Sequence, residues 1–256
     1  MKGDTNSAGP RQGESPFNAP EYDFSVATVP RHFYMIASTP RAGGTYLAQC
    51  LWRTGIMGAP HEYFGFYSTL LQMSARLQAR TLVEYFNRLL PLRTSANGVF
   101  GIKTHFDHLQ FMMLAGILER LERLTVIAIE RRDTLAQAAS HARALQTNQW
   151  TSLEGVAQRA PEYDPKLIAW CQNHLAAQRQ GWRDFFAKNG LSPIAVDYDD
   201  FLADPDATTR GIVERARFPD APVSPTSLPE TTPQSDALNA EWIERYRSET
   251  AADAQP

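Results

Sequence analysis

The stretch that decides the fold is TPRAGGTYLAQCL, which runs from Thr39 to Leu51. It follows a short apolar segment, FYMIAS, at residues 33–38, and it continues as a helical pattern to Arg53, with Gly55 just beyond. A strand, a glycine turn and a helix in this order begin a βαβ unit. Because glycines let a ligand approach the free amides at a helix start, we expect this turn to bind an anion.

The spacing within the turn excludes two familiar anion sites. Gly43 and Gly44 are adjacent and no lysine follows them, so the GxxxxGK[ST] loop of kinases and NTPases is absent. The GxGxxG pattern of dinucleotide-binding proteins is absent as well. Arg41 is the basic residue of this turn, and Thr45 can add a hydroxyl. A plain tight turn without a ligand is the alternative.

The rest of the chain alternates between strand and helix patterns. Strands are predicted at residues 99–103, 124–129 and 193–198, and Asp133 is predicted to cap a helix that reaches Trp150. The other predicted helices span residues 70–90 (stopped by Pro91), 106–121, 164–188, 205–217 and 239–248. This order predicts an α/β fold, a single-domain, P-loop-like parallel sheet flanked by helices on both faces.

Composition suggests how the chain is organised. Residues 1–30 are rich in Gly, Pro, Ser and Asn and predict a disordered leader, whereas residues 31–256 form the domain. Residues 219–233 carry five prolines and predict an extended segment before the C-terminal helix. Cys50 and Cys171 form no CxxC pair, which favours a reduced, cytoplasmic protein. The net charge of -3 argues against a nucleic-acid partner, and no apolar run is long enough for a transmembrane segment.

A second polar motif follows the strand at residues 124–129. It reads ERRDTLAQAAS, from Glu130 to Ser140, and it places Arg131 and Arg132 where the strand gives way to a helix. In a parallel sheet this strand end lies at the same edge as the glycine turn. An arginine there can form bidentate bonds to a second phosphate. The two motifs together predict a ligand with two separated phosphates, and a basic pair beside a helix cap is the alternative.

The combination of PRAGGTYL with R-D-x-x-A-Q-A-x-S resembles the sulfotransferase fold. Within that fold the chain most resembles the bacterial family of trehalose 2-sulfotransferase, over residues 33–248. Further similar stretches are TGIMGAPHEYF, GVFGIKTHFD, QGWRDFF, PIAVDYDDF and EWIERYRSE. The resemblance implies transfer of a sulfuryl group from 3′-phosphoadenylyl sulfate (PAPS), with PAP as the product and no metal. The acceptor would be a hydroxyl of a carbohydrate, a glycolipid or a similar small molecule.

The resemblance also implies roles for residues of both motifs. The 5′-phosphosulfate would lie on the turn, on Arg41, Ala42, Gly43, Gly44, Thr45 and Tyr46. Arg41 takes the place of the basic residue that stabilises charge on the leaving oxygen. Arg132 and Ser140 match the pair that holds the 3′-phosphate, and Arg131 is an equally available neighbour.

Two residues compete for the role of general base. Glu62, in APHEYF, aligns with the glutamate taken as base in trehalose 2-sulfotransferase. His105 ends a Lys103-Thr104-His105 stretch that resembles the K-T-H of cytosolic sulfotransferases, whose histidine is their base. We expect Glu62 to be the base and His105 to help it or to bind the acceptor. The expected acceptor side includes Tyr63, Phe64 and Lys103, and a place in the core or in a lid is the alternative for the aromatic residues of this loop.

Some residues depart from the family pattern. Ala42 and Gly44 stand where hydroxyl side chains are common, and Pro233 stands where a basic residue often contacts the 3′-phosphate. Arg245 or Arg247 could replace that basic residue. A member that binds nucleotide or sugar without turnover is therefore an alternative, and a nucleotide-dependent kinase is a weaker one. The resemblance also suggests a homodimer, formed through the helical stretch at residues 70–90.

Overall fold

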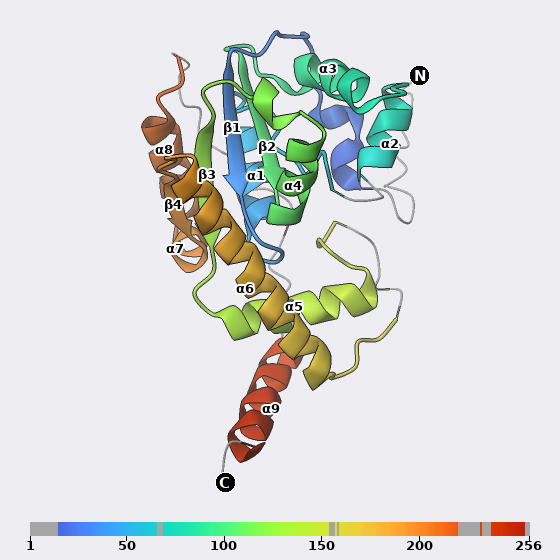
Figure 1. The fold of residues 1–256 in the computed structure, drawn as a ribbon, viewed down its shortest axis with the longest axis vertical. Coiled ribbons are helices and arrows are strands. Elements are labelled where there is room, and N and C mark those ends of the chain that lie inside the picture. Colours follow the sequence, from blue (N-terminus) through green and yellow to red (C-terminus); the bar gives the residue numbers. More distant parts are fainter. Residues whose placement is uncertain are drawn as a thin grey trace, which may run out of the picture.

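A four-stranded parallel sheet forms the centre of the computed structural model, which describes residues 15–65, 69–153, 157, 159–219, 231 and 237–253. Its strands are β1 (His32–Ala37), β2 (Val99–Thr104), β3 (Thr125–Glu130) and β4 (Ile194–Asp197), in the order β2-β1-β3-β4 (Figure 1). β1 pairs with both β2 and β3, so the turn after β1 leaves the middle of the sheet. The predicted α/β class and all four predicted strands are confirmed.

Helices cover both faces of the sheet. Phe33 and Met35 face a core that includes side chains of α3 (Leu82–Arg93), α4 (Phe106–Leu114) and α6 (Pro165–Lys188). Tyr34 and Ile36 face a second core that includes side chains of α1 (Gly44–Arg53), α7 (Tyr198–Ala203) and α8 (Pro205–Ala216). This alternation along β1 is the two-residue period of a strand buried on both sides.

A third, smaller core joins three helices below the sheet. It contains Ala138 and Ala142 of α5 (Thr134–Thr147), Cys171 and Leu175 of α6, and Trp242 of α9 (Ala237–Asp253). In Figure 1, α5, the first half of α6 and α9 extend away from the sheet. Asp133 caps α5 by accepting a hydrogen bond from the Ala136 amide, as predicted.

The helix predicted at residues 70–90 is in fact two helices. α2 (Thr69–Arg76) ends before Gln78, which adopts a left-handed φ of 53°, and the Thr81 side chain then caps α3 by accepting from the Glu84 amide. Pro91 lies inside α3 instead of stopping it. A proline in the last turn removes only one backbone bond, that of its missing N–H. The Pro91 carbonyl, which is near the end of the helix, accepts from the Thr28 amide.

Three smaller boundaries also differ from the prediction. The helix expected at residues 106–121 divides into α4 and a 3₁₀ turn, η3 (Leu118–Arg120), around Gly116, whose φ is 65°. α5 ends at Thr147 because Asn148 is left-handed, with a φ of 53°. The short helix α7 was not predicted, although Asp197 caps it by accepting from the amides of residues 199 and 200.

Residues 15–30 pack against the domain, so the expected disordered leader does not extend to them. They form two 3₁₀ turns, η1 (Pro16–Asn18) and η2 (Pro20–Tyr22). The Phe17 ring is buried and stacks on His61 at 4.7 Å. The Asp23 carboxylate forms ion pairs with Arg76 and with Arg93, the latter at 2.9 Å. Residues 1–14 and most of the predicted extended segment at 219–233, including Pro233, lie outside the described residues.

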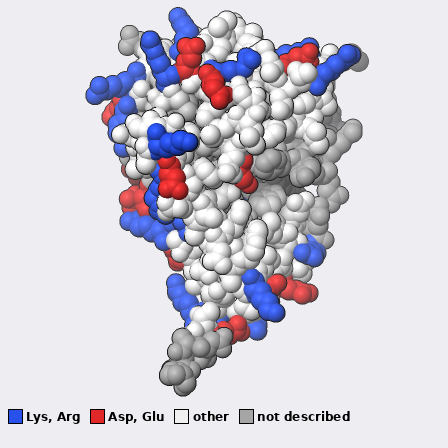
Figure 2. All heavy atoms as spheres, in the orientation of Figure 1, with Lys and Arg blue, Asp and Glu red and all other residues white. Residues whose placement is uncertain are grey.

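The face shown in Figure 2 carries basic and acidic side chains that are interspersed, mainly along its edges. No continuous basic area forms on this face. Among the described residues, no helix is long and apolar enough to cross a bilayer.

Replacing Asp23 with Asn should lower the free energy of unfolding by about 3 kcal/mol, because Arg93 is fully buried and would lose its charged partner. Urea denaturation monitored by circular dichroism measures this change. Glu122→Gln, at an exposed position, is the control and should change stability by less than about 0.5 kcal/mol. Equal stability of the two variants would contradict a structural role for residues 15–30.

Candidate functional site

The turn between β1 and α1 presents open backbone amides. Arg41 and Gly43 both have positive φ, 63° and 86°, which turns the chain sharply before α1. The Leu47 amide is the first to bond back into the helix, to the Gly43 carbonyl. The amides of residues 44–46 precede it, and Gly43 as the N-cap has no side chain to accept from them. A Cβ at Gly43 would lie 2.4 Å from the Tyr198 ring, so only glycine fits there.

Side chains from α5 and α6 hold the start of this turn in place. The Trp182 indole donates to the Ser38 carbonyl at 2.9 Å. The Gln137 amide donates to the Thr39 hydroxyl at 2.8 Å and to the carbonyl of residue 40 at 2.6 Å, and Arg179 donates to Gln137 in turn. The buried polar groups of the turn are thus satisfied without using the amides of α1. Gln137 was not predicted as a site residue, although it lies inside the AQAAS motif.

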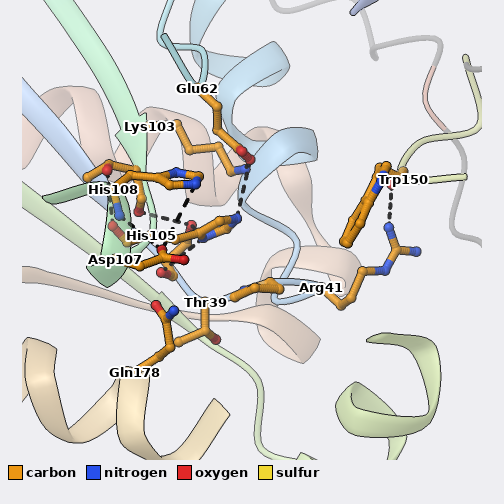
Figure 3. A network of polar contacts seen from close by, with 12 residues as sticks. Thr39, Arg41, Glu62, Lys103, His105, Asp107, His108, Trp150 and Gln178 are labelled. Atoms are coloured by element: carbon orange, nitrogen blue, oxygen red, sulfur yellow. Dashed lines mark hydrogen bonds and ion pairs between the residues drawn. The ribbon is translucent and has the colours of Figure 1, made fainter. Parts of the chain in front are cut away.

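Arg41 joins the two predicted motifs. Its Nε donates to the Ser140 hydroxyl at 3.0 Å, and its Nη1 donates to the Trp150 carbonyl. Figure 3 shows the side chain extending from the turn toward Trp150 and away from His105. The glycine turn and the first part of α5 therefore lie side by side, at the edge of the sheet where the parallel strands place them.

The two arginines after β3 have different surroundings. Arg132 is mostly exposed and forms ion pairs with three aspartates, Asp197 at 3.0 Å, Asp199 at 3.4 Å and Asp200 at 2.9 Å. The Arg131 guanidinium lies over the Tyr198 ring at 4.9 Å, and Tyr198 is the residue that packs on Gly43. Within the described part of the chain, Arg131 Nε is buried and has no hydrogen-bond partner. Arg131 therefore lies beside the turn with unused hydrogen-bonding capacity.

Glu62, Lys103 and His105 converge on the other side of the turn, and we call these three residues the base cluster (Figure 3). The Lys103 ammonium contacts the Glu62 carboxylate, and His105 Nε2 lies 3.3 Å from the same Glu62 oxygen. His105 Nδ1 lies 3.2 Å from the Ser38 hydroxyl. Nδ1 lies 3.2 Å from the Ser38 carbonyl as well. With the proton on Nε2, a neutral imidazole donates to Glu62 and accepts from the Ser38 hydroxyl at Nδ1, whereas the other tautomer donates from Nδ1 to the Ser38 carbonyl.

Burial sets the charge states within the base cluster. Desolvation lowers the pKa of Lys103 to about 7, and the positive charge of Arg41 acts in the same direction. Desolvation also lowers the pKa of His105 to about 3, with a further contribution from the charge of Lys103. The imidazole is therefore neutral at physiological pH, whereas Lys103 is partly charged.

Lys103 connects the base cluster to the turn. A Cβ added at Gly44 would lie 2.7 Å from Lys103 Cε, so the lysine side chain lies directly against the start of α1. Its ammonium is one bond further along and contacts Glu62. A cation from β2 thus stands beside the open amides, in a turn that lacks the lysine of a standard P-loop.

A second layer supports His105. The Gln178 side chain accepts from the Phe106 amide at 2.8 Å, which fixes the start of α4 immediately after His105. The His108 ring lies 5.3 Å from the His105 ring, and Asp107 accepts from the His108 amide at 2.9 Å. His105 is therefore held by backbone and side-chain contacts on both of its sides.

Other predicted site residues lie elsewhere. Tyr63 and Phe64, expected on the acceptor side, are buried in the core that contains Phe33, so neither ring is open to solvent. Arg245 pairs with Glu249 at 2.8 Å. Arg247 approaches Asp133, the residue after Arg132, at 3.9 Å.

The sequence matches the Stf0 sulphotransferase family over residues 33–249. It is 27% identical to trehalose 2-sulfotransferase of Mycolicibacterium smegmatis, across 87% of this chain and 97% of that protein. It is 25% identical to trehalose 2-sulfotransferase of Mycobacterium tuberculosis, across 84% of this chain and 94% of that protein. Among solved structures, the chain is similar to the sulfotransferase domain of the Synechococcus PCC 7002 olefin synthase. The alignment covers 86% of this chain and 89% of that domain. The two share 14% identity, with a TM-score of 0.49.

The family match includes the glycine turn, the base cluster, and the motif with Arg131 and Ser140. Since it spans most of the chain, the protein belongs to the Stf0 sulfotransferases and is an enzyme of sulfuryl transfer.

Proposed function

We propose that the chain transfers a sulfuryl group from PAPS to a hydroxyl of a carbohydrate, a glycolipid or a similar small acceptor, with Glu62 as the general base. The observation that carries this proposal is the position of Lys103. Its side chain lies against Gly44 of the turn while its ammonium contacts Glu62. The candidate donor site and the candidate base therefore share one cation.

The residues around the turn fit a donor with two phosphate groups. The open amides of residues 44–46 and the positive end of the α1 dipole suit the 5′-phosphosulfate. Arg131, with its buried Nε lacking a partner among the described residues, and Ser140 suit the 3′-phosphate. Arg132 also remains a candidate for the 3′-phosphate, although a phosphate there would compete with its three aspartates.

PAPS supplies an activated sulfuryl group whose leaving group is a phosphate. In the proposed step, Glu62 accepts the proton of the acceptor hydroxyl as that oxygen forms its bond to sulfur. The bond between sulfur and the phosphate oxygen breaks on the opposite side. Arg41 leaves Ser140 and donates to that leaving oxygen, where negative charge develops. His105 holds the Glu62 carboxylate in position through its Nε2–H.

Lys103 changes partners in this proposal. While it contacts Glu62, the carboxylate is a poor base because the ammonium stabilises its charged form. An anion on the turn attracts the ammonium toward Gly44, which lies next to Lys103 Cε. Glu62 then becomes a stronger base when the donor is bound. It therefore takes the proton of the acceptor hydroxyl during transfer and not before the donor has bound.

The expected homodimer is part of the proposal as well. Leu71 on α2 and Val83 on α3 are 62% and 40% exposed, so the region at residues 70–90 offers apolar surface. Light scattering during size-exclusion chromatography would give twice the mass of one chain, and a monomer at micromolar concentration would remove this part of the proposal.

Glu62→Gln should lower turnover at least 100-fold, because an amide cannot accept the hydroxyl proton, while PAP affinity changes less than about threefold. The measurement is transfer of labelled sulfate from PAPS in a screen of disaccharides, glycolipids and small hydroxylated metabolites. Glu122→Gln serves as the control. Near-normal turnover of Glu62→Gln with strongly reduced turnover of His105→Ala would assign the base to His105 instead.

The affinity for PAP should fall as the pH rises from 7 to 9. Lys103 carries its charge below a pKa of about 7 and loses it above, while the phosphates keep their charge over this range. Calorimetry at pH 7, 8 and 9 measures the change. Lys103→Met should bind PAP more weakly at pH 7 and show little further decrease. A decrease of equal size in Lys103→Met would assign the pH dependence to another group.

A further inference from the structure

Four aromatic side chains lie together beyond Arg41, which bonds the backbone carbonyl of one of them, Trp150. We call them the aromatic wall: Trp150, Trp170, His141 and His174. The His141 ring is central, at 6.0 Å from Trp150, 6.4 Å from Trp170 and 5.8 Å from His174. The proposed transfer step uses none of these rings.

One face of α6 leads from the turn to this wall. Trp170, His174, Gln178 and Trp182 follow one another at four-residue intervals and so share a helix face. At the inner end Trp182 bonds the Ser38 carbonyl, and Gln178 then contacts both the start of α4 and His174. At the outer end the Trp170 side chain is 52% exposed. The face therefore extends from the base of the turn to solvent.

His141 is a buried polar group with spare hydrogen-bonding capacity. It follows Ser140 directly on α5 and is only 3% exposed. Within the described residues, no hydrogen-bond partner reaches its Nδ1. Burial lowers the pKa of His141 to about 3, and the charge of His174 acts in the same direction, so the imidazole is neutral. A buried nitrogen of this kind gains from a ligand that brings a hydroxyl.

The two indoles offer flat apolar surface beside it. His174 covers one face of Trp170, with parallel rings 5.0 Å apart, and about half of the Trp170 side chain faces solvent. Trp150 is 37% exposed, and its carbonyl accepts from Arg41 of the turn. The wall thus adjoins the site of sulfuryl transfer, and none of its four members is a Lys, Arg, Asp or Glu side chain.

Flat apolar faces combined with a few neutral hydrogen-bonding groups suit a neutral ring that carries hydroxyls, more than they suit an anion. We infer that the aromatic wall binds a polyhydroxylated ring of the acceptor, with a C–H face of that ring against Trp170 and a hydroxyl on Nδ1 of His141. This inference rests on the proposed function, which makes the ligand of the wall the sulfuryl acceptor. It assigns acceptor binding to α5 and α6.

The test is binding of two probes, trehalose and PAP, to the full chain. Calorimetry and tryptophan fluorescence follow each probe separately, and trehalose is also titrated with PAP present. In Trp170→Ala and His141→Phe the dissociation constant for trehalose should rise at least tenfold, while that for PAP changes less than twofold. Trp170→Phe, which keeps a stacking ring, should retain most of the affinity. Leu114→Ala, at an exposed position on α4, is the control.

Any one of the following four outcomes would overturn the inference. Loss of PAP affinity in Trp170→Ala, with trehalose unaffected, would assign the wall to the adenine of the donor. Equal trehalose affinity in all variants would remove the wall from acceptor binding. If the native chain binds PAP but neither trehalose nor maltose nor myo-inositol at millimolar concentration, the wall has another role and the proposed donor stands. If it binds no PAP, the proposed function itself fails, whatever the sugar result.

Discussion

The rest of the site depends on how the backbone at the end of β1 is held. The chain must turn sharply after Ala37 and must leave the first amides of α1 open, yet its own polar groups are buried. Trp182 bonds the Ser38 carbonyl and Gln137 bonds the next two residues, so helices from the far half of the sequence fix the turn. Buried backbone groups without such partners would cost free energy, and the amides could not remain available for a ligand.

This arrangement connects the charges of the site. Ser38, held by Trp182, is also within hydrogen-bond distance of His105, which in turn approaches Glu62. Lys103 contacts Glu62 from the neighbouring strand, and Arg41 reaches Ser140 on α5. Two cations therefore flank the open amides, each with a partner it can exchange for an incoming anion. A standard P-loop places one lysine in the loop itself, whereas here the second cation comes from β2.

Much of the fold could be predicted from local patterns. All four strands were apolar runs bounded by turn or charged residues. Asp133 was predicted as a helix cap and Asp164 as the start of a helix, and both side chains cap their helices. The predicted elements were wrong where tertiary contacts override the local conformational preference of the sequence. Pro91 lies in the last turn of α3, where its missing N–H removes a single helical bond, and the Thr28 amide satisfies its carbonyl. Residues 15–30 look disordered by composition, yet Asp23 provides the partner of the buried Arg93.

The candidate site was predictable in its motifs but not in its contacts. The parallel sheet indicated that the two motifs would lie at one edge, but not that Arg41 would donate to Ser140. No pattern could decide between Arg131 and Arg132, since the difference lies in three aspartates from β4 and α7. The aromatic loop after α1 suggested that Tyr63 and Phe64 face the acceptor. They are core residues instead, and we propose rings on α5 and α6 for that role.

The central claim is that the glycine turn binds the donor through its backbone. Calorimetry with PAP on the native chain, Gly43→Ala and Gly55→Ala tests it most directly. Both glycines have positive φ, but only a Cβ at Gly43 meets another atom within 3 Å, whereas nothing lies within 4 Å of one at Gly55. Gly43→Ala should lower PAP affinity at least tenfold, and Gly55→Ala should bind PAP as the native chain does. Native affinity in a folded Gly43→Ala variant would contradict it.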